Sequence, residues 1–257
     1  MIALYATALM LYIDVLNKSY TMKKIISIKN LTKIFKNNKA IDDLSIDIDK
    51  GEIYGLLGSN GAGKSTTINI LLGFLKPDSG TSKINDIDTT INYEESRKYI
   101  GYISENVSLY PYLSGSENLD YFSKLNGKIH SLEEIKQLLN KCGLDDEAHH
   151  RRVETYSKGM RQKVGIAIAL SKQAKVYLMD EPASGLDPLA SNELSQLLKK
   201  LSSEGSSILM ASHDIFRVRE TCDRIGIIKK GKLVKEMSTS NVSTSELEKI
   251  YIDYMQD

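Results

Sequence analysis

One run of residues in the first third of the chain has the types and spacing that bind a phosphate chain. It consists of Gly58, Ser59, Asn60, Gly61, Ala62, Gly63, Lys64, Ser65 and Thr66, with the spacing G-x-x-x-x-G-K-[ST]. Glycines let such a loop fold round a polyphosphate so that its N–H groups point inward, while Lys64 reaches the terminal phosphates and Ser65 a Mg²⁺ ion. The sequence therefore predicts a site for a nucleoside triphosphate with Mg²⁺.

Two adjacent carboxylates, Asp180 and Glu181, follow the apolar run at residues 176–179. Open α/β sheets bind their ligands outside the carboxyl ends of the strands. We expect Asp180 to hold Mg²⁺ through water together with Ser65, and Glu181 to orient or deprotonate an attacking water. The alternative is an acidic strand end that faces solvent.

Three further segments carry polar groups with possible roles. His213 follows the apolar run 207–211, where a neutral imidazole can donate to a γ-phosphate and accept a hydrogen bond from the chain elsewhere. Ser157 is the expected N-cap of a helix, and Gly159 leaves backbone N–H groups open, so this helix start is a candidate anion site or simply a capped helix. Residues 149–152, two His and two Arg, are expected to form a solvated surface.

The hydrophobic pattern indicates the elements that must position these groups. Alternating apolar residues predict strands at 25–31 and 40–48, and short apolar runs predict strands at 52–57, 99–104, 175–179, 207–211 and 225–228. Helices are expected at 64–75, from Ser116, from Ser131 to Gly143, and at 157–170, 189–201 and 215–222. This pattern predicts an α/β fold with a helical insert between two strands of one sheet.

Composition narrows the class of protein. The chain has 257 residues and 41% hydrophobic residues, enough for a proper core. Lys and Arg total 34 against 33 Asp and Glu, so the formal charge of +1 gives no field that gathers nucleic acid. The two cysteines, Cys142 and Cys222, lack the spacing of a disulfide framework or zinc site, which favours a reducing intracellular setting.

In family order, these motifs resemble those of the ATPase subunits of ABC transporters, over nearly all of residues 25–237. The resemblance covers the Walker A loop (58–65), the Walker B strand (176–180) with Glu181 as general base, the signature motif (157–162), the D-loop (184–187) and the switch histidine (212–214). The signature, usually Ser-Gly-Gly-Gln, has Lys158 and Met160 as departures. The resemblance implies a P-loop NTPase of ABC type: a RecA-like core sheet, an antiparallel β subdomain and an inserted helical lobe.

The resemblance also implies roles for residues whose function could not be predicted from their type and position alone. Phe35 falls where the family stacks an aromatic on adenine, the alternative being a core Phe, and Asp187 lies in the D-loop near the nucleotide. Glu105 stands where most members carry the Gln of the Q-loop, a nucleotide and metal contact. The segment Gly-Tyr-x-x-Glu-Asn at 101–106 is similar to the branch of two-component exporters of drugs and polysaccharides, and to the ATPase for nitrous oxide reductase maturation.

The family resemblance further implies a head-to-tail dimer, a homodimer or a pseudo-dimer, with each ATP between one Walker A loop and the partner's Ser157 and Gly159. It implies membrane permease subunits, no nucleic acid, and a cytoplasmic position on the inner face of the cell membrane. The function implied is an exporter's ATP-hydrolysing motor; alternatives are an importer motor and an ABC ATPase acting on ribosomes or DNA.

Residues 25–257 are expected to form the nucleotide-binding domain, with the lobe at about 106–170. Residues 1–24 are expected to be an N-terminal extension, favoured as an over-long reading of the coding sequence.

Overall fold

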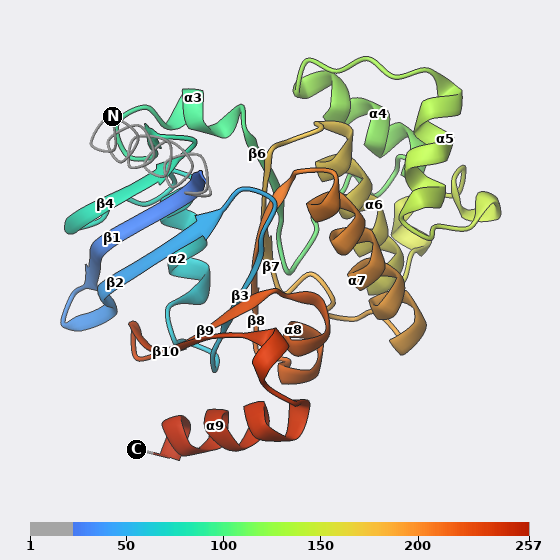
Figure 1. Cartoon of the computed structure of the whole chain (residues 1–257). Coiled ribbons are helices and arrows are strands. Elements are labelled where there is room, and N and C mark those ends of the chain that lie inside the picture. Colours follow the sequence, from blue (N-terminus) through green and yellow to red (C-terminus); the bar gives the residue numbers. More distant parts are fainter. Residues whose placement is uncertain (1–22, 257) are drawn as a thin grey trace, which may run out of the picture.

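Helix α2 (Lys64–Leu71) lies between two β-sheets in the computed structural model, which describes residues 23–256 (Figure 1). The expected N-terminal extension falls almost wholly outside the described residues. None of the helices among residues 23–256 combines the length and the apolar content that a bilayer-spanning segment requires.

The larger sheet has six strands in the order β10-β9-β3-β8-β7-β6. These are β3 (Ile53–Leu57), β6 (Ile100–Ile103), β7 (Val176–Asp180), β8 (Ser207–Ser212), β9 (Arg224–Lys229) and β10 (Lys232–Ser238). All neighbours pair in parallel except the hairpin of β9 and β10. Strands β3, β7 and β8 are buried at every position, which explains why they appear in the sequence as continuous apolar runs.

The smaller sheet is antiparallel in the order β2-β1-β4-β5. Its strands are β1 (Lys24–Phe35), β2 (Asn38–Asp49), β4 (Ser79–Ile84) and β5 (Ile87–Asp88). One face packs against α2, and among residues 23–256 the side chains on the other face are largely exposed, so burial alternates along the strands as the sequence predicts. After β4 the chain turns at Asn85 and Asp86, both of which adopt positive φ.

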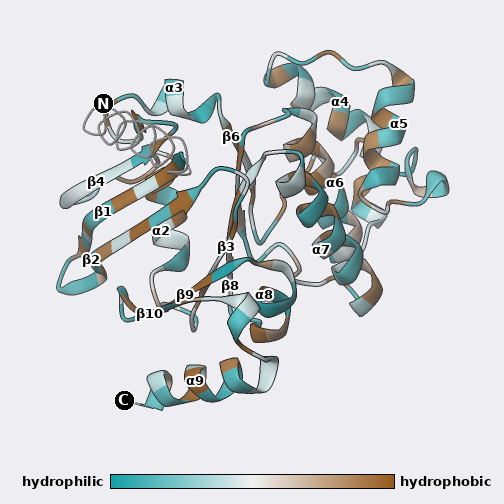
Figure 2. Cartoon of the chain, in the orientation of Figure 1, coloured by the Kyte–Doolittle hydropathy of each residue, from teal (hydrophilic) through white to brown (hydrophobic). Residues whose placement is uncertain are grey.

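The face of the larger sheet opposite α2 is covered by α6 (Lys158–Ser171), α7 (Pro188–Ser203) and α8 (Ile215–Thr221). Helices α4 (Gly115–Leu125) and α5 (Leu132–Lys141) pack on α6, α9 (Thr244–Gln256) packs on α8, and α3 (Tyr93–Arg97) lies beside β5 and β6. Short 3-10 turns occur at Asp146–Ala148, Val153–Thr155 and Thr239–Asn241. Apolar residues concentrate on the strands and the inner faces of these helices (Figure 2). The helices α4, α5 and α6 come between β6 and β7 in sequence and form a group beside the sheet (Figure 1).

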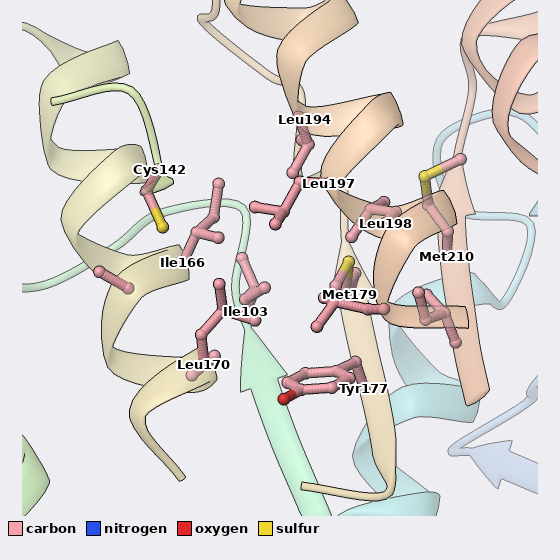
Figure 3. Packing of buried hydrophobic residues seen from close by; sticks show 14 of the residues in the cluster. Ile103, Cys142, Ile166, Leu170, Tyr177, Met179, Leu194, Leu197, Leu198 and Met210 are labelled. Atoms are coloured by element: carbon pink, nitrogen blue, oxygen red, sulfur yellow. The ribbon is translucent and has the colours of Figure 1, made fainter. Parts of the chain in front are cut away.

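Helices α6 and α7 are fixed to the sheet by one apolar cluster. Figure 3 shows Ile166 and Leu170 of α6 and Leu197 of α7 directed toward Tyr177 and Met179 of β7. Cys142 lies in the same cluster, and burial raises the pKa of its thiol to about 12. A buried thiol of that kind is a packing group and is not a nucleophile at neutral pH.

Three sequence expectations are wrong in detail, each for a local reason. Helix α2 stops at Leu71 rather than near residue 75, because Gly73 adopts φ +67°. His149 is buried, and its Nε2 lies 2.9 Å from the carbonyl oxygen of Leu144, so residues 149–152 are not a uniformly solvated surface.

The third correction concerns the start of α4. Ser114, not Ser116, is the N-cap: the Ser114 hydroxyl accepts a hydrogen bond from the N–H of Glu117 (3.2 Å), and the Glu117 carboxylate accepts one from the N–H of Ser114 (2.7 Å). Ser131 caps α5 in the same reciprocal way, as the sequence predicts.

We expect Ser114→Ala to lower the free energy of unfolding by about 1 kcal/mol, because it removes the acceptor for an otherwise unpaired helix N–H. Ser116→Ala is the matched control, and its effect should stay within about 0.5 kcal/mol. Urea unfolding followed by circular dichroism measures both. Equal effects of the two substitutions would contradict the assignment of the cap.

Candidate active site

The parallel register brings the ends of four strands to one edge of the larger sheet. Leu57 of β3 is level with Ser212 of β8, Asp180 of β7 with Ala211 of β8, and Ile103 of β6 with Met179 of β7. The segments that follow these strands are the Gly58 loop, His213, Glu181 and the Ser104–Glu105 segment. Groups far apart in the chain are therefore neighbours.

The phosphate-binding loop, residues 58–66, is attached to the sheet at both ends. The N–H of Gly58 donates to the carbonyl of Ser212 (3.2 Å), and the N–H of Gly231 donates to the carbonyl of Ala62 (2.9 Å). Gly231 lies in the hairpin between β9 and β10, and sequence reasoning assigned it no role. Its only signal in the sequence is the Lys-Gly-Lys turn, which does not show what the turn contacts.

Two glycines with positive φ lie in this loop, one in a crowded position and one in an open position. Gly63 has φ +112°, and a Cβ there would lie 2.5 Å from the carbonyl oxygen of Ala40, so only glycine fits. Gly61 has φ +79°, but a Cβ there would meet nothing within 4 Å. Together with Ser59 and Asn60, Gly61 forms the exposed tip of the loop. The loop is thus fixed at its base and open at its tip, as a phosphate cradle requires.

Lys64 is buried at the base of this cradle with 6% of its side chain exposed. Its Nζ donates to the carbonyls of Gly58 (2.7 Å) and Ser59 (3.2 Å) and lies 3.6 Å from Oε1 of Glu181. A buried ammonium needs such partners, because burial of an unpaired charge is strongly unfavourable. Lys64 therefore lies between the loop and the acidic strand end.

Glu181 is held in a fixed position by two partners. Its Oε2 accepts a hydrogen bond from the Ser212 hydroxyl (3.0 Å), and its Oε1 lies 2.8 Å from Nδ1 of His213. The residue adopts φ +48°, a strained conformation that is most frequent at functional sites. Glu181 is buried, so it does not simply face solvent. Sequence reasoning missed Ser212, although its place before His213 at a strand end was a usable signal.

The contact between His213 and Glu181 bears on the expected hydrogen-bond pattern of the imidazole. An ionised carboxylate can only accept, so beside an ionised Glu181 it is Nδ1 that carries the proton of this hydrogen bond. In that tautomer His213 donates to the chain, whereas the sequence expectation has the imidazole accept from it. A hydrogen bond from Nε2 to a phosphate then requires a proton on both ring nitrogens or a change of tautomer.

Asp180 lies beside Lys64 and has the properties of a cation ligand. Burial raises the pKa of its carboxyl, while the neighbouring Ser65 hydroxyl opposes that rise and the negative charge of Glu105 adds to it. Oδ1 of Asp180 is buried and has no hydrogen-bond partner within residues 23–256. An unpaired buried carboxylate oxygen next to a hydroxyl matches the oxygen donors that Mg²⁺ prefers. The side chains present therefore fit a Mg²⁺ ion.

Phe35 is not a core residue, so that alternative is wrong. It ends β1 with 43% of its surface exposed, and it pairs with Asn38 in the β1–β2 hairpin. Ala40, two residues further on, is the residue whose carbonyl touches Gly63. The hairpin therefore holds an exposed aromatic ring near the phosphate-binding loop.

The signature segment does not join this group of side chains. Ser157 caps α6 as predicted, because its hydroxyl accepts a hydrogen bond from the N–H of Met160 (3.2 Å), and it is exposed. A Cβ on Gly159 would lie 3.0 Å from the carbonyl oxygen of Gly185. Within residues 23–256 no hydrogen bond connects Ser157 to the phosphate-binding loop.

The side chain of Asp187 likewise forms no hydrogen bond with Lys64 or Glu181. It is the N-cap of α7, and its Oδ1 accepts a hydrogen bond from the N–H of Ala190 (2.9 Å). That hydrogen bond lowers the pKa of the Asp187 carboxyl. The structure thus gives Asp187 a structural contact within the chain and leaves its side chain at the surface.

Comparisons with known proteins agree with this geometry. The family model described as ABC transporter matches residues 41–184. The uncharacterized ABC transporter ATP-binding protein YhcH of Bacillus subtilis is 40% identical over 226 residues, which are 88% of this chain and 73% of that protein. The linearmycin resistance ATP-binding protein LnrL of the same organism is 33% identical over 208 residues, 80% of this chain and 67% of that protein.

Among solved structures, the fold resembles a dimeric post-hydrolysis state of an ATP-binding cassette bound to ADP and phosphate. The TM-score is 0.77 at 28% identity, over 83% of this chain and 98% of that one. The predicted α/β P-loop fold is therefore confirmed, and so is the family. The chain belongs to the ABC transporter family, as an ATP-binding subunit that hydrolyses ATP.

Proposed function

We propose that the chain is the motor subunit of a membrane exporter, that it hydrolyses MgATP as a dimer, and that Lys64, Glu181 and His213 carry the chemistry. The observation that carries this proposal is the chain of contacts from Lys64 through Glu181 to His213 at the open edge of the sheet. We assign residues 25–257 to one nucleotide-binding domain with a helical lobe at about 106–170.

Binding of ATP exchanges the partners of Lys64. Its ammonium leaves the carbonyls of Gly58 and Ser59 for the terminal phosphates, because a phosphate oxygen is a stronger acceptor than a carbonyl. The ion pair with Glu181 is then weakened, and the Glu181 carboxylate is free to accept a proton. The loop N–H groups and the N-terminus of α2 hold the remaining phosphate charge.

The catalytic step follows from where Glu181 is held. Glu181 takes a proton from a water molecule, whose oxygen forms a bond to the γ-phosphorus, while the bond to the β-phosphate oxygen breaks and its electron pair stays on ADP. Ser212 fixes the carboxylate during this step. His213, with a proton on Nε2 after a change of tautomer or with both ring nitrogens protonated, donates to the γ-phosphate. Phosphoryl transfer depends mainly on such positioning and charge neutralisation.

Mg²⁺ would be held by Ser65 and by Asp180 through water, with Glu105 nearby. The ion would supply positive charge that neutralises the charge on the phosphates. The unpaired Oδ1 of Asp180 supports this assignment. Phe35 would stack on the adenine, since its exposed ring projects from the hairpin that touches the loop.

A dimer would complete the site. Ser157, Gly159 and Asp187 are exposed or lie at the surface, and none is bonded to the phosphate-binding loop of its own chain. We propose that Ser157 and Gly159 contact the nucleotide of a partner subunit, a homodimer or a pseudo-dimer. The related ATP-binding cassette of known structure is dimeric, which supports the same arrangement.

A permease would dock across the upper side of the molecule as seen in Figure 1, beside α3 and α4. Exposed aromatic residues occur on both sides: Phe74 and Tyr93 near α3, and Tyr110 and Tyr112 before α4. Such exposed apolar groups mark interaction surfaces. The resistance named for LnrL and the Glu at position 105 support export over import. We propose that the permease holds the subunit at the inner face of the cell membrane.

We expect Glu181→Gln to reduce ATP turnover by at least about 100-fold, because an amide cannot accept the proton from water. ATP binding should persist, since Lys64 and the loop are unchanged, and the variant should elute as an ATP-dependent dimer in size-exclusion chromatography. Glu204→Gln, an exposed substitution at the end of α7, is the matched control.

Turnover at the wild-type rate would remove Glu181 from the base role. The same tagged Glu181→Gln variant, purified with ATP from detergent-solubilised membranes of its host, tests the transporter assignment. Recovery of a polytopic membrane protein supports it. Recovery of ribosomes or DNA instead would favour the alternative classes of ABC ATPase.

We expect Asp180→Asn to raise the melting temperature of the nucleotide-free protein at pH 8. The pKa of Asp180 is raised above its ordinary value of 3.8 by burial, so its ionisation opposes folding, and stability is lost as pH rises through the folded-state pKa. The gain should therefore shrink as the pH is lowered toward 3.8. Scanning calorimetry at several pH values measures it.

The same variant should gain less thermal stability than wild type from Mg²⁺ with a non-hydrolysable ATP analogue. Asp187→Asn is the control: the pKa of Asp187 is lowered by the Ala190 N–H, so its ionisation favours folding and the substitution should give no gain. A lower melting temperature for Asp180→Asn at pH 8 without nucleotide would contradict the claim that the buried charge of Asp180 destabilises the fold.

A further inference from the structure

Lys158 occupies the signature position where the family usually has glycine, and it makes a defined contact. Its Nζ donates a hydrogen bond to the hydroxyl oxygen of Ser184 at 2.9 Å. Ser184 begins the D-loop, residues 184–187, which follows β7 and Glu181 closely in the chain. Lys158, the residue that departs from the family pattern, therefore connects the start of α6 to the segment that follows Asp180 and Glu181.

The stem of Lys158 reinforces this connection through packing. Gly185 has φ +83°, and a Cβ there would lie 2.8 Å from Cδ and 3.1 Å from Cγ of Lys158. On the neighbouring side, Gly159 lies against the carbonyl of Gly185. The lysine thus covers the D-loop with its methylene groups and holds Ser184 with its ammonium. Long side chains commonly combine these two kinds of contact.

The D-loop is in turn bonded to the proposed general base. The N–H of Ser184 donates to the carbonyl of Glu181 at 3.0 Å, in a turn that contains the strained φ of Glu181. Ser184 therefore connects Lys158 to the backbone of Glu181 through two hydrogen bonds, one accepted by its hydroxyl oxygen and one donated by its N–H.

We propose that Lys158 is a positioning residue that couples the two ATP sites of the dimer. The nucleotide of the partner subunit engages Ser157 and Gly159, on either side of Lys158, and Lys158 holds Ser184 so that Glu181 of its own chain points at its own nucleotide. This inference rests on the proposed dimeric function. A dimer in which one bound ATP fixes the base for the other hydrolyses ATP cooperatively.

The experiment is a double-mutant cycle on ATP hydrolysis. Lys158→Met keeps the stem over Gly185 but removes the donor, and Ser184→Ala removes the acceptor. Each single variant should lower kcat about fivefold, the factor expected when one hydrogen bond is lost from the transition state. The KM for ATP should stay within about twofold, because the Lys64 loop is untouched, and the Hill coefficient should fall toward one.

The double variant should be no slower than either single variant, because both remove the same interaction. Lys158→Arg should restore most of the wild-type kcat, since it keeps a donor. Lys128→Met is the control: it removes an exposed lysine whose side chain makes no hydrogen bond or ion pair with residues 23–256.

Three outcomes would overturn the coupling role. They are unchanged kcat in the single variants, multiplicative losses in the double variant, and an effect on KM alone, which would instead place the Lys158 ammonium on a nucleotide. Failure of the proposed function itself has a different signature. In that case the wild-type protein forms no ATP-dependent dimer, and its specific activity does not rise with protein concentration.

Discussion

The parallel register of β3, β8 and β7 is the constraint on which the site depends. It places Leu57, Ser212 and Asp180 at one edge of the sheet, so that the residues immediately after them share a small volume. No local interaction could bring these residues together, because Leu57 lies more than a hundred positions before Asp180 and Ser212, and a helix separates those two. The apolar clusters that bury both faces of the sheet therefore stabilise the fold and set the distance from Lys64 to Glu181.

Within that frame, Lys64 and Glu181 stabilise each other until a phosphate chain replaces the contact. The ammonium is buried on carbonyl oxygens, and the carboxylate is held by Ser212 and His213. Asp180 nearby has an unpaired oxygen. Of these groups only Asp180 has an incomplete environment within residues 23–256, and the Mg²⁺ of MgATP would complete it. The site thus gives up some stability in exchange for affinity, as sites that bind charged ligands often do.

Sequence patterns predicted the order of strands and helices because buried parallel strands and capped helices leave strong local signals. The loop glycines, Asp180 and Glu181 were identified in the same way. The errors concern interactions that depend on the tertiary fold. Nothing in the sequence shows that Gly231 supports the loop, or that His149 is buried on Leu144. The cap of α4 was misplaced by two residues, since both Ser114 and Ser116 are suitable and only the contact with Glu117 separates them.

The most direct measurement is a crystal structure of the protein with Mg²⁺ and a non-hydrolysable ATP analogue. The account predicts that Nζ of Lys64 leaves the Gly58 carbonyl for the terminal phosphates, that the ion binds Ser65 and faces Asp180, and that the γ-phosphate lies between Glu181 and His213. Ser157 of a second copy should lie on the same phosphate. A triphosphate bound elsewhere, or a Lys64 that keeps its carbonyl contacts, would contradict the account.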